Sequence, residues 1–401
     1  MKTTGIIAEY NPFHNGHKYH LEKARELTDC DYLIIVMSGD YTQRGTPAIY
    51  SKYIRAKAAL LAGADLVLEM PVYGSVASAP DFAACGVNTL SSTGICDHLF
   101  FGSESGDIDA LRMQANALTT ESEEFSNKIK SGLKSGLSWP DARANAFRET
   151  NIVASQPNDI LGIEYLQALN KIDSLIIPMT VKRNDPGYHS EEKTGKFASA
   201  TAARKAILEN DLEFLLEVLP DEHFQSLHDN SCPPITFDDC SLLLCEKLLT
   251  YTLDDLMQIS GMPEDLARKL HKHKLDFHSA SQLVAERKDR NYTYTRINRC
   301  LLNTMLGIKK ADTLLFKEYS SAPWLRILGF RKDAAPLLSH LKKNADAPLI
   351  TKTANYSSIL SEGRLELFEK HLQTAELYRL ISQLKSGKSA KNEFTNSVIM
   401  I

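Results

Sequence analysis

Five short apolar runs, separated by stretches of helical periodicity, constrain the fold of this chain more than any other feature. The runs cover residues 5–8, 32–37, 65–70, 98–101 and 174–179. A continuous apolar run is typical of a strand that is covered on both faces. Parallel strands need long crossover connections, which helices usually supply, so the alternation favours a parallel sheet. The sequence therefore predicts an α/β, Rossmann-like domain with a five-stranded parallel sheet.

The first apolar run leads into a polar turn that carries two histidines. Pro12 fixes one backbone angle of the turn, and a helical pattern begins at about Asn15. Free amides at a helix start, together with the positive end of its dipole, can bind an anion such as phosphate. His14 and His17 can both donate to phosphate oxygens from one face of the first turn, and Gly16 allows close approach. The two histidines can alternatively cap the helix or fill space.

His-x-Gly-His is the pattern of nucleotidyltransferases, and here it directly follows the first predicted strand. Open α/β sheets place their ligand crevice at the carboxyl ends of such strands. This context favours the functional interpretation of the histidine pair, so we predict that His14 and His17 contact the phosphates of a nucleotide.

Two further segments have the residue types of a phosphate site. Ser199 or Thr201 caps a predicted helix, and Arg204 can curl back to the same point, so that hydroxyls, amides and a guanidinium converge. Asn158 lies at the start of another predicted helix, where it either faces an anion or serves as a simple N-cap. Arg183 follows the fifth predicted strand.

Length and composition indicate a globular chain of more than one domain. The chain has 401 residues, of which 43% are hydrophobic and 24% are charged. Its seven cysteines show no C-x-x-C pair or zinc-ligand spacing, which favours reduced thiols in a cytosol and no bound metal. No run of about eighteen apolar residues occurs, so we expect a cytoplasmic protein that does not enter a membrane.

The second half changes to amphipathic helices, which we predict at residues 211–218, 239–250, 252–259, 262–274, 279–288 and 294–306. Residues 268–310 contain eleven Lys or Arg against three Asp or Glu, and RNA phosphates are the expected partner. The candidate RNA contacts interleave aromatic and cationic side chains. They are Arg290, Tyr292, Tyr294, Arg296 and Arg299. A solvated helix face is the alternative interpretation.

The predicted organisation is a nucleotide-binding domain at residues 1–205, a basic helical domain at 206–320 and a small α/β unit at 321–401. The last unit contains a possible βαβ motif, with strands at 325–330 and 348–350.

The segments quoted above resemble the bacterial tRNA(Met) cytidine acetate ligase family along the whole chain. The most specific matching motifs are at residues 8–17, 19–20, 38–40, 43–45, 101–104, 156–159, 182–183 and 199–201. The resemblance implies a HIGH-type nucleotidyltransferase domain that activates acetate as acetyl-AMP with release of pyrophosphate. The acetyl group would then pass to N4 of the wobble cytidine of elongator tRNA(Met). The implied partners are this tRNA, ATP and acetate, with no DNA.

The resemblance also implies which residues hold ATP. In and around the first turn they are Ile7, Ala8, Glu9, Tyr10, Asn11, Pro12, Phe13, His14, Asn15, Gly16, His17, Lys18, Tyr19 and His20. Gly102, Asn158 and Arg183 complete the implied set. We predict Ser199, Thr201 and Arg204 as additional phosphate contacts, and Mg²⁺ held mainly by the nucleotide, since no acidic pair with metal spacing is evident.

The acetate or the acceptor base is expected near the end of the second strand. The candidates there are Ser38, Asp40, Arg44, Lys52 and Arg55. The sequence does not indicate which residue would act as a general base for the cytidine amine. Two other functions stay open: transfer of AMP or CMP to a small phosphorylated metabolite, and RNA binding without catalysis in a protein that senses a nucleotide.

Overall fold

The computed structural model describes residues 1–119, 123–137, 142, 145, 156–183, 198–229, 233–288 and 292–401. The predicted loop at residues 184–195 and the predicted RNA contact Arg290 lie outside the described residues.

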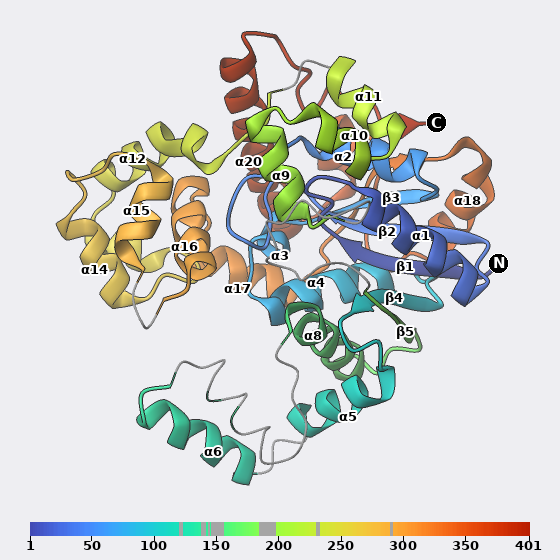
Figure 1. Ribbon diagram of the computed structural model, residues 1–401, viewed down its shortest axis with the longest axis horizontal. Coiled ribbons are helices and arrows are strands. Elements are labelled where there is room, and N and C mark those ends of the chain that lie inside the picture. The colour runs from blue at the N-terminus through green and yellow to red at the C-terminus, as the bar shows by residue number, and fades with distance from the viewer. Residues whose placement is uncertain are drawn as a thin grey trace.

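A mixed β-sheet runs through the centre of the molecule (Figure 1). Its strands are β1 (Thr3–Ala8), β2 (Tyr32–Ser38), β3 (Leu66–Met70), β4 (His98–Ser103), β5 (Ile177–Lys182), β6 (Leu325–Phe330), β7 (Leu349–Ile350) and β8 (Ile399–Met400). The order β5-β4-β1-β2-β3 contains the five predicted parallel strands. The chain moves outward from β1 to β3 and then returns to the other side of β1 with β4. This reversal creates a crevice between β1 and β4, where open sheets bind ligands.

The sheet has more strands than the five predicted. β6 pairs antiparallel with β3, and β7 and β8 both pair with β6. The predicted βαβ motif is present as β6, α18 (Ala335–Asn344) and β7, but it extends the central sheet. No local sequence pattern indicates that two strands far apart in the chain pair with each other. The antiparallel pairing of residues 66–69 with residues 326–330 could therefore not be predicted.

The fifth strand begins later than predicted. Residues 174–176 connect the turn after α8 (Pro157–Lys171) to the strand, and the amide of Ser174 still donates to the carbonyl of Leu169 in that helix. The side chain of Leu175 is 96% exposed. Pairing with β4 begins only at Ile177, whose amide donates to the carbonyl of Asp97.

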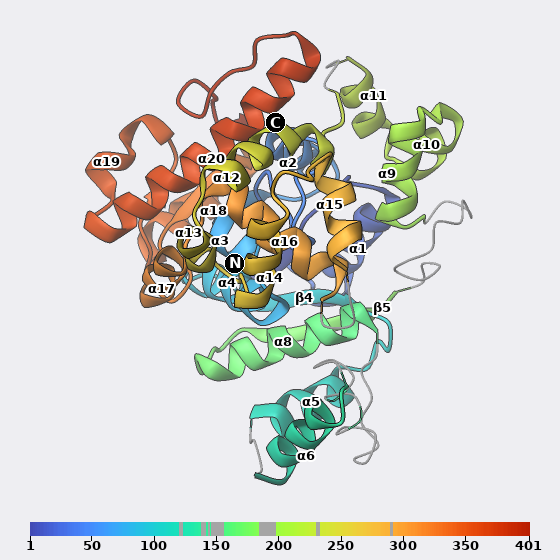
Figure 2. The ribbon, with the colours of Figure 1, turned by 90° about the vertical axis from the view of Figure 1, so that its left-hand side faces the viewer.

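Helices cover both faces of the sheet and build a core on each. On β2, Leu33, Ile35 and Met37 belong to the core that contains residues of α1 and α2, whereas Ile34 and Val36 belong to the core that contains residues of α4 and α8. This is the alternation that a strand buried on both faces requires. The helices in this part are α1 (Asn15–Thr28), α2 (Lys52–Leu61), α3 (Val72–Ser75), α4 (Ala79–Ser91), α5 (Ile108–Thr119), α6 (Glu123–Lys134) and α8 (Pro157–Lys171). Both views place α6 beyond α8 (Figures 1 and 2).

The predicted helical region follows β5 along the chain. Its elements are α9 (Ala200–Glu209), α10 (Leu212–Val218), α11 (Asp221–Asp229), the 3-10 helix η1 (Phe237–Cys240), α12 (Ser241–Thr250), α13 (Leu253–Gln258), α14 (Glu264–Lys272), α15 (Ala280–Arg287), α16 (Tyr294–Leu306) and α17 (Lys310–Glu318). In Figure 1, α12, α14, α15 and α16 gather to one side of the sheet. The predicted helices of this region are confirmed to within a few residues, while α11 and α17 were not predicted.

The C-terminal segment returns to the sheet. Besides α18 it contains η2 (Lys332–Ala334), η3 (Thr353–Asn355), α19 (Tyr356–Ile359) and the long α20 (Glu362–Ser386). Two buried hydroxyls fix α20 to the segment after β2: Tyr41 donates to the carbonyl of Thr374, and Tyr378 donates to the carbonyl of Ala48. None of the described helices is both long enough and apolar enough to cross a membrane.

Candidate active site

A cavity of about 290 Å³ opens at the crevice between β1 and β4. Residues at the carboxyl ends of β1, β4 and β5 and at the starts of α1, α8 and α9 line it. Three parallel strands and three helix N-termini therefore point toward one volume, which is the arrangement that α/β proteins use to bind anionic ligands.

His14 and His17 form a stacked pair at the start of α1. Their ring centroids lie 3.7 Å apart with an interplanar angle of 26°. The amide of Gly16 donates to Nδ1 of His14 at 3.1 Å, and the amide of His14 donates to Nδ1 of His17 at 3.2 Å. Because both Nδ1 atoms accept, each neutral ring carries its proton on Nε2. Backbone amides thus orient both imidazoles beside the cavity, and the Gly16 amide at the start of α1 is one of them.

The ring of His17 is neutral near pH 7. Burial lowers the pKa of His17 well below its ordinary value, and the nearby His14, Arg183, His20 and His223 lower it further. A neutral imidazole can still donate through Nε2 to a phosphate oxygen, so the site has a donor without a fully charged cation at this position.

Tyr10 packs beside the histidine pair in a backbone conformation that is rare for its side chain. Its φ is +51°, in the left-handed region. The buried ring makes edge contacts with Phe13 and His17 at centroid distances of 4.8 and 4.9 Å. Strained backbone of this kind is common at functional sites, and here it positions an aromatic side chain against the second histidine.

The β4 side of the cavity is organised by Glu104. Its carboxylate accepts from the backbone amides of Asn158 and Asp159 and from the side-chain amide of Asn158, at 3.2, 2.8 and 2.7 Å. Glu104 therefore fills the anion position at the start of α8, where we had considered Asn158 as a cap or as an anion contact. Asn158 is not the N-cap, but it lines the cavity, where its Oδ1 lies 3.5 Å from the guanidinium of Arg183, and it stays a predicted ATP contact. The N-cap of α8 is Gln156.

The α9 side of the cavity contains the second predicted phosphate segment. Ser199 is the N-cap, and its hydroxyl accepts from the amide of Ala202 at 3.1 Å. The guanidinium of Arg204 donates to the carbonyl of Asn11 at 2.6 Å and to the hydroxyl of Thr201 at 3.0 Å. These contacts tie α9 to the turn that precedes the histidine pair.

Most of the predicted ATP contacts surround the cavity. Those that line it are Ile7, Ala8, Glu9, Tyr10, Asn11, His14, Gly16, His17, Tyr19, His20, Gly102, Asn158, Arg183, Ser199, Thr201 and Arg204. Pro12, Phe13, Asn15 and Lys18 do not line it. Phe13 is fully buried behind the histidines, and the side chain of Asn15 turns away to donate to the carbonyl of Glu217.

The cavity also has lining residues that were not among the predicted site residues. They are Ile6, Gln43, Phe82, Phe101, Leu161, Tyr165, Val181, Lys182 and Ala200. Most are apolar or aromatic, so one wall of the cavity suits a flat ring such as a base. An available signal was their position at strand ends, which applies to Phe101, Val181 and Lys182.

Of the five residues predicted to hold acetate or the acceptor base, only Arg44 lines the cavity. Ser38, Asp40, Lys52 and Arg55 are buried in the interior. The guanidinium of Arg55 donates to the backbone carbonyls of Glu9, Ser38, Gly39 and Tyr50. Its charge therefore holds the turns after β1 and β2 together, and it is not directed at a ligand.

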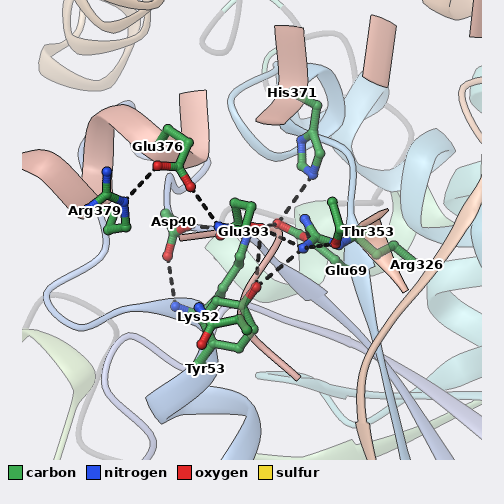
Figure 3. Close-up of polar contacts among 12 residues, drawn as sticks. Asp40, Lys52, Tyr53, Glu69, Arg326, Thr353, His371, Glu376, Arg379 and Glu393 are labelled. Carbon is green, nitrogen blue, oxygen red and sulfur yellow. Dashed lines mark hydrogen bonds and ion pairs between the residues drawn. The ribbon is translucent and has the colours of Figure 1, made fainter. Parts of the chain in front are cut away.

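Lys52 belongs to a buried charge cluster, which we define as Asp40, Lys52, Glu69, Arg326, His371 and Glu393 (Figure 3). The ammonium of Lys52 lies 2.9 Å from Glu69, 3.0 Å from Glu393 and 3.6 Å from Asp40. The guanidinium of Arg326 pairs with the same two glutamates, and Nε2 of His371 lies 3.3 Å from Glu69. Each charge in the cluster thus has partners within the protein.

The pairing shifts the protonation of the cluster. Burial opposes ionisation of Glu69 and Glu393, but Lys52 and Arg326 outweigh it and hold the pKa of both carboxyls below the usual value. For Asp40, burial dominates and raises the pKa, although Lys52 partly offsets it. The structure places Lys52 in this cluster and not at the cavity, and no local sequence pattern connects it to Glu69, Glu393 and Asp40, which come from separate segments.

The predicted RNA contacts on α16 separate into buried and exposed residues. Tyr292 is buried and its hydroxyl donates to Asp265, so its ring is not available to stack on a base. The guanidinium of Arg299 donates to the carbonyl of Gln43 at 3.2 Å. Tyr294, which is 47% exposed, and the exposed Arg296 remain on the surface of the helix.

In the described part of the chain, no three His, Cys, Asp or Glu side chains come together as a group that could hold a metal ion. A divalent cation at this site would accordingly depend on oxygen ligands supplied by a phosphate chain.

Comparison with known proteins gives concordant matches over the full length. Residues 1–393 match the HIGH Nucleotidyl Transferase family. The tRNA(Met) cytidine acetate ligases of Thermoanaerobacter sp. (strain X514) and Acetivibrio thermocellus are 38% and 35% identical to this chain, with 100% of each chain covered. The crystal structure of apo TmcAL from Thermotoga maritima has a TM-score of 0.93 at 31% identity and full coverage of both chains. The same protein bound with alpha-thio ATP has a TM-score of 0.91.

Proposed function

Because the chain belongs to the tRNA(Met) cytidine acetate ligases of the HIGH nucleotidyl transferase family, we propose that it is an ATP-dependent ligase that acetylates a cytidine of tRNA(Met). Its substrates are ATP, acetate and elongator tRNA(Met), and the modified atom is N4 of the wobble cytidine. The observation that carries this proposal is the stacked pair His14 and His17, with both Nε2 donors beside a cavity at the β1/β4 crevice.

The reaction requires activation of acetate. The lone pair of the cytidine amine is delocalised into the ring, so the amine does not attack an unactivated carboxylate. An acetate oxygen attacks the α-phosphorus of ATP, the bond to the β-phosphate oxygen breaks and pyrophosphate leaves. N4 then attacks the acetyl carbon, the carbon–oxygen bond to AMP breaks, and the amine loses a proton to solvent or to a base.

The catalytic residues are His14 and His17. Negative charge grows on the phosphate oxygens as pyrophosphate leaves, and donors already aimed at that charge lower the barrier. The two Nε2–H groups are held in place by backbone amides, so they need no reorganisation during the reaction. Glu9, Asn11, Tyr19 and His20 complete the lining around the nucleotide.

The outer phosphates lie toward α9 in this proposal. Ser199 and Thr201 present hydroxyls at its start, and Arg204 and Arg183 supply guanidinium groups from two sides of the cavity. A helix N-terminus together with guanidinium groups favours bound phosphate. Gly102 leaves room for the Arg183 side chain to pack against β4, since a β-carbon there would lie 3.1 Å from it.

Mg²⁺ accompanies ATP in this proposal and is bound by the phosphate oxygens. It would neutralise charge on the leaving pyrophosphate, and the side chains named above would orient the nucleotide that carries it.

The tRNA binds to the basic helical region, with Tyr294 and Arg296 as exposed contacts. We retain the division into a nucleotide-binding domain at 1–205, a helical domain at 206–320 and a C-terminal unit at 321–401 that extends the sheet. The proposed reaction takes place in the cytoplasm.

Acetate labelled with ¹⁸O on both oxygens tests this function. With ATP and elongator tRNA(Met), we expect N4-acetylcytidine and AMP that carries one ¹⁸O atom, because the attacking acetate oxygen stays on phosphorus. Label in inorganic phosphate with formation of ADP would contradict attack at the α-phosphorus. Pyrophosphate release driven by a phosphorylated metabolite, with acetate inert, would favour a small-molecule nucleotidyltransferase. Binding of tRNA without any turnover would favour a nucleotide sensor.

A further inference from the structure

The loop at residues 41–47 connects the nucleotide cavity with the helical region. Tyr41 and Pro47 pair as an antiparallel bridge at its base, so the loop is a closed turn. Gln43 and Arg44, near its tip, line the cavity. The loop thus forms one wall of the cavity, and its position fixes two polar side chains in that wall.

The backbone of Gln43 is held from both sides. Its amide donates to the carboxylate of Glu9 at 2.7 Å, and Glu9 follows β1 and lines the cavity. Its carbonyl accepts from the guanidinium of Arg299 on α16 at 3.2 Å. A hydrogen bond to a charged donor or acceptor is stronger than a neutral one. Both of these bonds are of that kind, so together they fix the residue next to Arg44.

Gly45 brings the loop into direct contact with α16. Its φ is +76°, and a β-carbon there would lie 2.3 Å from the backbone nitrogen of Arg299 and 2.6 Å from the carbonyl carbon of Asn298. Backbone atoms of a helix cannot move aside as a flexible side chain can, so only glycine fits. The helical region and the cavity wall therefore touch along one side of this loop.

We propose, on the basis of the proposed function, that Arg299 is a positioning residue for acetate. It holds the loop at residues 41–47 so that Arg44 and Gln43 receive the acetate carboxylate. A guanidinium and a carboxamide are both donors that match a small carboxylate. Arg44 would touch the substrate, whereas Arg299 acts through the carbonyl of Gln43. The basic helical region thereby contributes to the activation of acetate as well as to tRNA binding.

This assignment differs from the sequence prediction, in which Arg299 contacts tRNA. An RNA contact would affect tRNA affinity and leave activation of acetate unchanged. A residue that positions the cavity wall would affect activation of acetate and leave tRNA affinity unchanged. The two half-reactions can be measured separately, because formation of acetyl-AMP from ATP and acetate is reversible and exchanges labelled pyrophosphate into ATP.

The experiment measures acetate-dependent exchange of pyrophosphate into ATP, with and without elongator tRNA(Met), in the full-length protein. The variants are Arg299→Ala, Arg299→Lys and Gly45→Ala, and the control is Arg112→Ala, which removes an exposed arginine of α5. Filter binding gives the tRNA affinity of each variant, and thermal melting verifies that each is folded.

For Arg299→Ala we expect the KM for acetate to rise about tenfold, as for loss of one hydrogen bond to a charged group. The KM for ATP and the tRNA affinity should stay within about twofold of wild type. Arg299→Lys can still donate to the Gln43 carbonyl and should restore most of the acetate KM. Gly45→Ala, whose β-carbon would displace the loop from the backbone of α16, should raise the same constant, and Arg112→Ala should change nothing.

An unchanged acetate KM together with weaker tRNA binding in Arg299→Ala would overturn the inference and make Arg299 an RNA contact. If Arg299→Ala does not fold, Gly45→Ala decides instead, and an unchanged acetate KM in that variant would likewise overturn the inference. Wild-type protein that shows no acetate-dependent exchange, with or without tRNA, would instead overturn the proposed function itself.

Discussion

The nucleotide cavity and the buried charge cluster lie at the same edge of one sheet, yet their polar and charged side chains are used in opposite ways. Around the cavity, backbone amides donate to the Nδ1 atoms of His14 and His17 and orient both rings in the cavity lining. In the cluster, Lys52 and Arg326 are neutralised by Glu69 and Glu393 inside the protein. A polar or charged residue that follows a strand can therefore serve a ligand site only if protein groups do not satisfy all of its interactions.

The difference follows from what covers each part of the edge. β1, β4 and β5 end at the open crevice, whereas β6 flanks β3 in the sheet, and Glu393 from the C-terminal segment closes over Lys52. Burial of a charge costs free energy unless the charge is paired. In the covered part of the edge, each charge of the cluster is accordingly paired with another. The open part keeps water or ligand access and can perform chemistry.

Removal of Lys52 should give the largest effect. Lys52→Met leaves Asp40, Glu69 and Glu393 close together without their shared cation. We expect the free energy of unfolding to fall by about 3–5 kcal/mol, as for other broken buried ion pairs. Urea unfolding monitored by circular dichroism measures it. A fall below about 1 kcal/mol, the range of exposed pairs, would mean that the cluster is open to water.

Removal of His17 should affect chemistry and spare stability. His17→Ala deletes one of two donors at the phosphates, and we expect the acetate-dependent exchange rate to fall about 10²- to 10³-fold. The free energy of unfolding should change by less than about 1 kcal/mol, since His17 lines a cavity and is not part of the buried cluster. Exchange kinetics and urea unfolding of the same preparation give both values. Full activity in the variant would remove the histidine pair from the mechanism.

Acid should separate the two regions. The pKa values of Glu69 and Glu393 are lowered on folding, so their stabilisation is present above the ordinary glutamate pKa of 4.5 and is lost as the pH falls below it. Asp40, whose pKa is raised, acts in the opposite direction. We expect the free energy of unfolding to decrease between pH 5 and about 3. The decrease should be smaller in Lys52→Met, and equal slopes in both proteins would contradict the pairing.

In the cavity, the low pKa of His17 predicts that its ring stays neutral between pH 8 and 6. The exchange rate should therefore show no fall from protonation of His17 in this interval. A fall centred near pH 6.5 that disappears in His17→Asn would show that the ring titrates normally and is exposed to solvent.

The smallest effect is expected at Glu104. Glu104→Gln keeps the shape but removes the charge that accepts from the start of α8. We expect a KM for ATP about two- to fivefold higher, because Asn158 and Arg183 lose part of their support. Steady-state kinetics with varied ATP measures it, and Glu222→Gln, an exposed glutamate in the first turn of α11, is a matched control that should leave the KM unchanged.

Local patterns predicted the parts of the fold that depend on local structure. The apolar runs predicted β1 to β4 to within a few residues. The histidine motif starts a helix, Ser199 is a helix N-cap, and the helices after α9 begin close to the predicted residues. The prediction failed where partners are distant. Glu393 and Arg326 lie more than 250 residues from Lys52, and Arg299 is bonded to Gln43 across a similar separation. The local sequence around a charged side chain near a strand end is the same whether or not a distant residue pairs with it in the fold.

The most direct test of the account is a crystal structure of this protein with alpha-thio ATP. We expect the nucleotide in the β1/β4 crevice, with its phosphates within hydrogen-bond distance of Nε2 of His14 and His17, and with Lys52 still paired to Glu69 and Glu393. A nucleotide bound away from both imidazoles, or Lys52 turned out of the cluster toward a phosphate, would contradict the account.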